Sequence, residues 1–126
     1  MGVVISSSAK FLAVLEVGRQ SDGALRRELI AAAYHASLAA PVLLVLDRVS
    51  PAEVDKVLDR VVRSSSLNRP GVRYANVEDD ATVLGAAKQA HRIFASSDCF
   101  RAKLETRGLP YRDPTDLECD LAALIA

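Results

Sequence analysis

The chain has 126 residues, of which half are hydrophobic and a quarter are charged, a composition typical of one compact folded domain rather than a disordered segment. Sixteen Lys and Arg residues balance sixteen Asp and Glu residues, so the overall charge gives no argument for binding nucleic acid or a membrane surface. No apolar run is long enough to span a membrane and the amino terminus lacks a signal-peptide pattern, so we expect a cytoplasmic protein.

Short β-rich runs alternate with longer helical patterns along the first half of the chain. Gly18 closes the first helical pattern, and the pair Ser50 and Pro51 has the residues preferred at the N-cap and first position of a later helix. These patterns predict five elements: a strand at 2–5, helices at 8–17 and 22–38, a strand at 41–46 and a helix at 51–62.

The second half continues the same alternation after a clear loop at 64–71. Thr115 and Glu118 have the spacing of a capping box, which marks the start of a last helix. The strand and helix order predicts an α/β fold in which a single domain, residues 1–126, has three layers and a mostly parallel central sheet flanked by helices. The elements predicted here are a strand at 72–75, a helix at 80–90, a strand at 92–95, a helix from 98, an edge segment at 108–114 and the last helix.

Three acidic residues, Glu53, Asp80 and Asp98, stand near the starts of helices that follow predicted strands. Each also has a purely structural interpretation. Glu53 completes a capping box with Ser50, while Asp80, with its neighbour Asp79, and Asp98 are favourably placed at helix starts, where carboxylates interact with unpaired backbone amides. Three such acids are nevertheless expected to meet at one end of a parallel sheet.

A cluster of carboxylates at one sheet edge suits phosphodiester cleavage with a divalent metal. Mg²⁺ and Mn²⁺ are held by a few carboxylates together with waters and substrate phosphate. The ion activates a water molecule and stabilises the negative charge that develops during cleavage. The sequence therefore predicts Glu53, Asp80 and Asp98 as candidate catalytic and metal-binding residues.

Four stretches of the chain, read together, resemble PIN domains over nearly the whole length. The first likeness is an apolar strand and helix at the start, and the second is a Glu near a helix start. The third is an Asp that opens an alanine-rich helix, followed by a strand and a second Asp. The fourth is a Gly-apolar segment before a last helix. The stretches are "VVISSSAKFLAVL", "SPAEVDKVL", "DDATVLGAAKQAHRIFASSDCFRAKL" and "RGLPYRDPTDL".

The resemblance implies a function, a cofactor and partners. PIN domains are metal-dependent ribonucleases and often the toxins of toxin-antitoxin pairs, so it implies Mg²⁺ or Mn²⁺ at Glu53, Asp80 and Asp98, RNA as the substrate and an antitoxin protein as a partner. The family commonly pairs, and the Ala-rich and Val-rich helix faces exceed what one core needs, so we expect a homodimer.

The sequence departs from the PIN pattern at its first acidic position, which this alignment places at Ser6. A serine hydroxyl is uncharged and is a poor Mg²⁺ ligand. The resemblance therefore implies weak or absent ribonuclease activity, with Asp79 or Asp47 as acids that could compensate.

An alternative function follows from the same serines. Ser7 and Ser8 at a predicted helix start, with Lys10 one turn later, offer hydroxyls, free amides and a positive charge to an anion. The segment lacks the glycines of a phosphate-binding loop. On this interpretation the protein is a non-catalytic α/β module that binds an anion or nucleic acid through Ser6–Ser8 and Lys10.

Basic residues around the 64–71 loop provide a candidate path for an RNA backbone, against the common alternative of solvated surface charges. The cysteines fit no metal or redox spacing and are expected to be reduced thiols: Cys99 and Cys119. The candidate RNA-binding arginines are Arg60, Arg63, Arg69 and Arg73.

Overall fold

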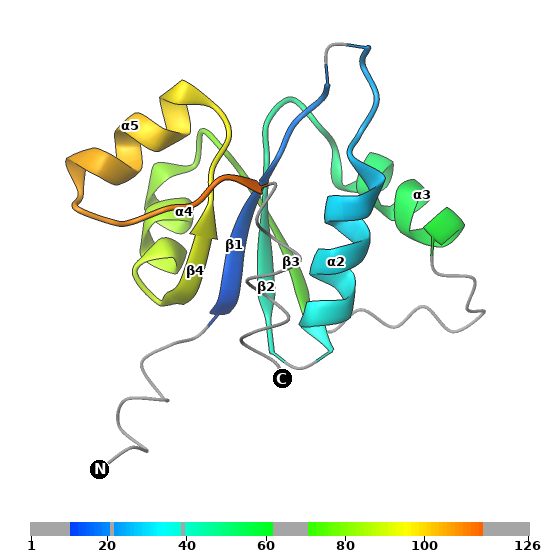
Figure 1. Cartoon of the computed structure of the whole chain (residues 1–126), viewed down its shortest axis with the longest axis horizontal. Coiled ribbons are helices and arrows are strands. Elements are labelled where there is room, and N and C mark those ends of the chain that lie inside the picture. The colour runs from blue at the N-terminus through cyan, green and yellow to red at the C-terminus, as the bar shows by residue number, and fades with distance from the viewer. Residues whose placement is uncertain (1–10, 21, 39, 62–70, 115–126) are drawn as a thin grey trace.

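A computed structural model describes residues 11–20, 22–38, 40–61 and 71–114 (Figure 1). It contains a four-stranded parallel sheet with strand order β3-β2-β1-β4, and helices alternate with the strands along the chain, which confirms the predicted α/β class. The strands are β1 (Phe11–Val17), β2 (Val42–Leu46), β3 (Val72–Asn76) and β4 (Ala90–Phe94). The helices are α2 (Arg27–Ser37), α3 (Pro51–Val61), α4 (Asp80–Ala87) and α5 (Asp98–Thr106).

The register of the sheet brings the carboxyl ends of its strands to one edge. Val17 at the end of β1 lies opposite Leu46 at the end of β2, which in turn lies opposite Asn76 at the end of β3. On the other side of β1, Leu15 lies opposite Phe94, the last residue of β4. The connections after these strands therefore meet at the same edge, where open α/β sheets bind their ligands.

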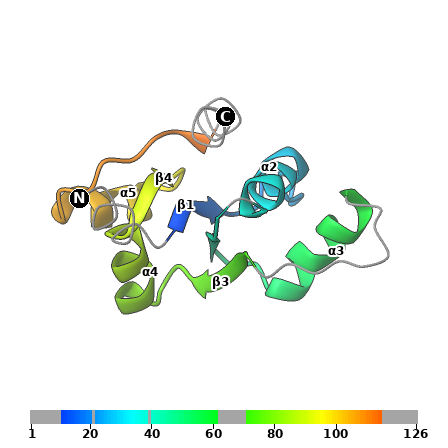
Figure 2. The same cartoon turned by 90° about the horizontal axis from the view of Figure 1, so that it is seen from below.

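Helices cover both faces of the sheet, so the predicted three-layer arrangement is confirmed (Figures 1 and 2). Ile30 of α2 and Leu58 of α3 belong to one buried apolar cluster, together with Leu15 of the central strand. Val83 of α4 and Phe100 of α5 belong to a second cluster on the opposite face. Burial of these two helix faces supplies the main stabilisation of the domain.

The predicted helix at 8–17 is wrong, because residues Phe11–Val17 form β1. Strands β2 and β4 flank β1, and six of its seven residues are buried. A strand covered on both faces is mostly apolar, and such a short run cannot be distinguished from a buried helix by periodicity. The predicted strand at 2–5 and the serines at 6–8 lie outside the described residues.

Most of the other predicted elements are present with shifted ends. The helix predicted at 22–38 begins only at Arg27, after a short turn in which Arg19 and Leu25 form an isolated antiparallel bridge. The edge segment contributes a single bridge between Phe94 and Arg112. Elements confirmed within a few residues are β2, α3, β3, α4, β4 and α5, while residues 64–70 and the last helix lie outside the described residues.

No helix in the described ranges is both long enough and apolar enough to cross a membrane.

Candidate functional site at the carboxyl edge

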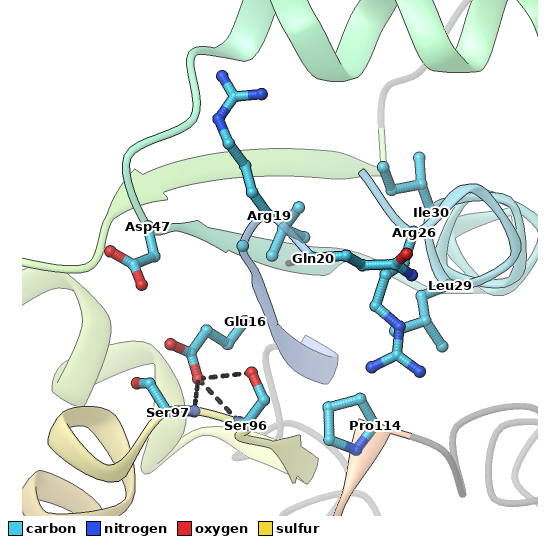
Figure 3. Close-up of a pocket in the computed structure, with 12 residues that line it drawn as sticks. Glu16, Arg19, Gln20, Arg26, Leu29, Ile30, Asp47, Ser96, Ser97 and Pro114 are labelled. Carbon is cyan, nitrogen blue, oxygen red and sulfur yellow. Dashed lines mark hydrogen bonds between the residues drawn. The ribbon is translucent and has the colours of Figure 1, made fainter. Parts of the chain in front are cut away.

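A pocket of about 330 Å³ opens at the carboxyl edge of the sheet, next to the ends of β1 and β2 and to the residues that follow β4 (Figure 3). We call it the carboxyl-edge pocket. Its apolar wall comes from α2 and from the segment after α5. The charged residues that line it are Glu16, Arg19, Arg26 and Asp47, and the apolar wall contains Leu29, Ile30 and Pro114.

Glu16 is the buried charged residue at this pocket, with only 3% of its surface exposed. Its Oε1 atom accepts hydrogen bonds from the backbone amides of Ser96 (2.8 Å) and Ser97 (2.9 Å), and a longer one from the Ser96 hydroxyl (3.3 Å). These contacts fix the carboxylate between β1 and the start of α5 (Figure 3). Buried charges are stable in proteins when they are hydrogen-bonded in this way.

The alternation of β1 explains this orientation. Glu16 is two residues beyond Val14, so both side chains project toward the face covered by α4 and α5. The Oε2 atom accepts no hydrogen bond from the described residues. It is not completely buried. One oxygen of Glu16 is thus occupied in holding the fold, and the other is open to the pocket.

Asp47 is the second carboxylate of the pocket and follows β2 directly. Its backbone amide donates to the carbonyl of Val17 (2.9 Å), which fixes its position beside the end of β1. The Asp47 side chain has no hydrogen-bond or ion-pair partner among the described residues. The next residue, Arg48, has a φ of 58°, a left-handed conformation that is costly for a residue with a side chain.

Two arginines line the pocket but are used differently. Arg19 reaches toward α3, where it forms an ion pair with Glu53. It also donates to the carbonyl of Gly23 (3.2 Å), in the turn before α2. Arg26 precedes α2, and its side chain extends toward Pro114 (Figure 3). The Nε atom of Arg26 is buried and has no hydrogen-bond partner, and none of its guanidinium nitrogens bonds to a described residue.

Glu53 does not join this pocket, because its carboxylate is engaged at the start of α3. Oε2 accepts from the amide of Ser50 (2.8 Å), and the Glu53 amide donates to the Ser50 hydroxyl (3.3 Å), which is the capping box weighed above. The hydrogen bond from the Ser50 amide, followed by that from Arg19, lowers the pKa of Glu53 below its usual value. Its position is explained by helix capping.

The other two predicted acids also lie outside the pocket lining. Asp79 caps α4 by accepting from the amide of Thr82 (3.4 Å), while Asp80 pairs with Lys103 of α5 (2.7 Å) and raises the pKa of that lysine. Asp98 is exposed on the first turn of α5, directly after Ser97 of the pocket.

Within the described ranges, no group of three or more His, Cys, Asp or Glu residues could hold a metal ion. Glu53, Asp80 and Asp98 are all described, so the prediction that they form one ligand cluster is wrong for this structure. The physical reason is that helix capping and ion pairs with cationic side chains engage Glu53 and Asp80. None of the three lines the carboxyl-edge pocket, although Asp98 follows its residue Ser97 in sequence and Glu53 pairs with its residue Arg19.

The remaining candidates are placed as follows. Ser6, Ser7, Ser8 and Lys10 lie outside the described residues, but the helix that was to present them is replaced by β1, which removes the basis of the proposed helix-start anion site. Arg63 and Arg69 are also outside the described residues. Arg60 is exposed near the end of α3, and Arg73 is exposed on β3.

Glu16 and Arg26 were not among the predicted site residues, although the sequence carries a signal for Glu16. "FLAVLEV" is an apolar run interrupted by one acid just before Gly18. An ionisable residue within a buried strand must find hydrogen-bond partners, so it is a candidate for a structural or functional role. No local sequence signal identifies Arg26, because only the folded structure places it over the pocket.

Comparison of the chain with family models, with curated proteins and with solved structures gave no match.

Proposed function

We propose that this protein is a PIN-like endoribonuclease that cleaves RNA phosphodiesters in the carboxyl-edge pocket. The observation that carries the proposal is the placement of Glu16. The resemblance requires an acid at the end of the first strand, and β1 has Glu16 next to its last residue with one carboxylate oxygen open to the pocket. With this alignment the acidic position is filled, and a serine at position 6 no longer argues against activity.

The donor set of the pocket suits a divalent ion that is shared with the substrate. Mg²⁺ is commonly bound by one or two carboxylates and completes its coordination with waters and substrate phosphate oxygens. Glu16 Oε2 and the unpartnered carboxylate of Asp47 are two such donors, and Asp98 is adjacent in sequence to the pocket. A bound Mg²⁺ or Mn²⁺ would supply an activated water and charge stabilisation at the phosphate.

The remaining pocket residues bind and orient the substrate in this proposal. Arg26 donates to a phosphate oxygen, because its guanidinium is unpartnered in the described chain and Arg matches the geometry of phosphate. The apolar wall formed by Leu29, Ile30 and Pro114 contacts the sugar or base next to that phosphate. Arg19 does not take this role, because Glu53 holds it toward α3.

The proposal is tested by measuring cleavage of single-stranded RNA with Mn²⁺ and with Mg²⁺. Glu16→Gln keeps a side-chain oxygen that can accept from the Ser96 and Ser97 amides, so we expect it to fold. It loses the negative charge, so we expect its cleavage rate to fall by about 100-fold or more. Asp47→Asn is expected to lower the rate as well.

Glu105→Gln is the matched control, because Glu105 is exposed on α5 and does not line the carboxyl-edge pocket. It should cleave at the wild-type rate, and thermal unfolding should show that all variants are folded. A wild-type protein that binds RNA but does not cleave it with either ion would favour the non-catalytic alternative. Equal rates for Glu16→Gln and Glu105→Gln would contradict the assignment of Glu16.

An antitoxin partner and a homodimer remain predictions from the resemblance. The described surface bears one exposed large hydrophobic residue, Leu38 at the end of α2, with 66% of its surface exposed. Light scattering at tens of micromolar would show whether the chain pairs.

A further inference from the structure

A second pocket, of about 230 Å³, lies along β4 near the opposite end of the sheet. One wall is the first part of β4, and the other wall is the segment after α5 that contains Leu109, Pro110 and Tyr111. We call this pocket the β4 groove. It shares no lining residue with the carboxyl-edge pocket, and it has no part in the function proposed above.

The groove exists because the edge of β4 is only partly paired. In the described sheet β4 pairs with β1 on one side. On its other side the segment after α5 pairs only with the end of β4: the Arg112 amide donates to the carbonyl of Ile93 (2.8 Å), and the Ala95 amide donates to the carbonyl of Arg112 (3.1 Å). Pro110, two residues earlier, has no backbone N–H to donate. The described residues therefore leave a gap beside the first half of β4.

The far wall of the groove is held in place by Arg101 of α5. Its guanidinium lies over the ring of Tyr111, 5.4 Å from the centroid, while its Nε donates to the carbonyl of Ala95 (2.8 Å) and its Nη2 to Asp113 (3.2 Å). Contacts on both sides of Arg112 thus tie the segment to α5 and β4. The groove is bounded by fixed elements on both sides.

The charged groups of the β4 groove are all basic. Lys88, Arg92 and Arg112 line it together with His91, and no carboxylate is among its lining residues in the described chain. His91 and Arg92 are consecutive residues of an edge strand, so they project to opposite faces and flank the groove on both sides. The positive charges of Lys88 and Arg92 at one groove repel each other, and an anion between them would relieve that repulsion.

Arg92 gives a second and independent indication of a ligand. Its Nη1 donates to the backbone carbonyl of His91 (2.9 Å), which fixes the guanidinium locally. Its Nε is buried and has no hydrogen-bond partner. Buried donors without a partner are rare and costly, so an acceptor from outside the described chain is expected at this position.

We infer that the β4 groove binds a phosphate group, either as free phosphate or as part of a nucleic-acid strand. A guanidinium and an ammonium group that line one groove match an anion with several oxygens, and arginine hydrogen-bonds phosphate in a fork geometry. On RNA the groove would hold a backbone phosphate away from the carboxyl-edge pocket.

The test is a titration of ¹⁵N-labelled protein with inorganic phosphate and, separately, with a short single-stranded RNA. Both titrations use the Glu16→Gln variant in EDTA, so that RNA is not cleaved and the result does not depend on the proposed nuclease activity. We expect the amide signals of residues 88–92 and 111–112 to shift with one or both ligands. Arg92→Gln and Lys88→Gln should each weaken this binding by about fivefold or more.

Lys56→Gln is the matched control for Lys88→Gln, because Lys56 is exposed on α3 and lines neither pocket. It should leave the binding constant unchanged. Shifts with phosphate alone identify a free anion as the ligand, and shifts with RNA identify a backbone phosphate; either outcome supports the inference. The inference is overturned if these amides shift with neither ligand. It is also overturned if Lys88→Gln and Lys56→Gln have equal effects on binding, and this comparison holds even if Arg92→Gln fails to fold.

Discussion

The carboxyl-edge pocket and the β4 groove share one feature and differ in another. Each contains an arginine, Arg26 or Arg92, with a buried Nε that has no hydrogen-bond partner. The first pocket also contains Glu16 and Asp47, whereas the lining of the second contains no described carboxylate. A guanidinium alone can bind phosphate, but cleavage with a divalent ion requires anionic donors beside it.

This difference follows from the positions of the two pockets on a parallel sheet. Residues that follow β1, β2 and β4 meet at the carboxyl edge, so side chains distant in sequence, such as Glu16 and Ser97, can combine there. The β4 groove is formed by one strand, the end of α4 and the segment after α5, so it draws on fewer elements. We therefore interpret the first as a reaction site and the second as a binding site.

The largest effect on stability should come from Glu16. Glu16→Ala removes the acceptor of two backbone amides at the start of α5, and donors left without a partner cost about 1 to 3 kcal/mol in the free energy of unfolding. Arg92→Gln removes one hydrogen bond, from Nη1 to the carbonyl of His91, and a charge whose Nε is already unpartnered, so its effect should be smaller, about 1 kcal/mol or less. Urea unfolding measures both, and equal losses would remove this distinction between the two pockets.

Arg26→Gln should affect ligand binding more than stability. We expect the KM for RNA cleavage to rise by about tenfold, close to 1.4 kcal/mol, since a phosphate contact is lost while no internal hydrogen bond of the side chain is broken. Arg27→Gln is the control, because Arg27 is exposed and lines neither pocket. If Arg26→Gln also weakened phosphate binding at residues 88–92, the two pockets would not be independent.

The sequence predicted the order of elements from β2 onward because those elements have strong local signals. Pro51 with Ser50 marks the start of α3, and Asp98 marks the first turn of α5. Strand β1 was missed because its hydrophobicity reflects burial on both faces of the sheet, under α2 on one face and under α4 and α5 on the other. That tertiary environment has no local counterpart in the sequence.

The same error displaced the candidate site. With the first strand placed at 2–5, its terminal acid was sought at Ser6, and Glu16 was assigned to a helix. The edge at which the site was predicted does carry a pocket, and Asp47, considered as a compensating acid, lines it. The preference of Glu53 for its capping box over a metal site depends on Arg19, a residue 34 positions away, so the spacing alone could not decide it.

Backbone strain gives a smaller test of the carboxyl edge. Arg48 is the residue other than glycine that has a positive φ in the described chain, and it lies next to Asp47. Arg48→Gly should relieve this strain and raise the free energy of unfolding by about 0.5 to 1 kcal/mol. Lys56→Gly, within α3, should instead lower it by about 1 kcal/mol. A destabilised Arg48→Gly protein would mean that the Arg48 side chain contributes more than its conformation costs.

The smallest expected effect concerns Glu53 and pH. Hydrogen bonds from the Ser50 amide and Arg19 lower the pKa of Glu53 in the folded protein below the ordinary 4.5, so its charged form stabilises the fold. That contribution is fully present above the unfolded-state pKa and is lost as the pH falls through the lower, folded-state pKa. In Glu53→Gln the contribution is absent at every pH, so the difference in unfolding free energy between wild type and variant should shrink from about pH 6 to about pH 3.

The same variant also tests the contrast between the two pockets. Without the charge of Glu53, Arg19 is no longer held toward α3 by an ion pair and becomes available to the carboxyl-edge pocket. The pocket then becomes more positive and so more like the β4 groove. RNA binding at the amides of residues 16–20 should therefore strengthen slightly, and binding at residues 88–92 should not change. A pH-independent difference in stability would show that Glu53 is not engaged in solution, and the expected gain in binding would then be absent as well.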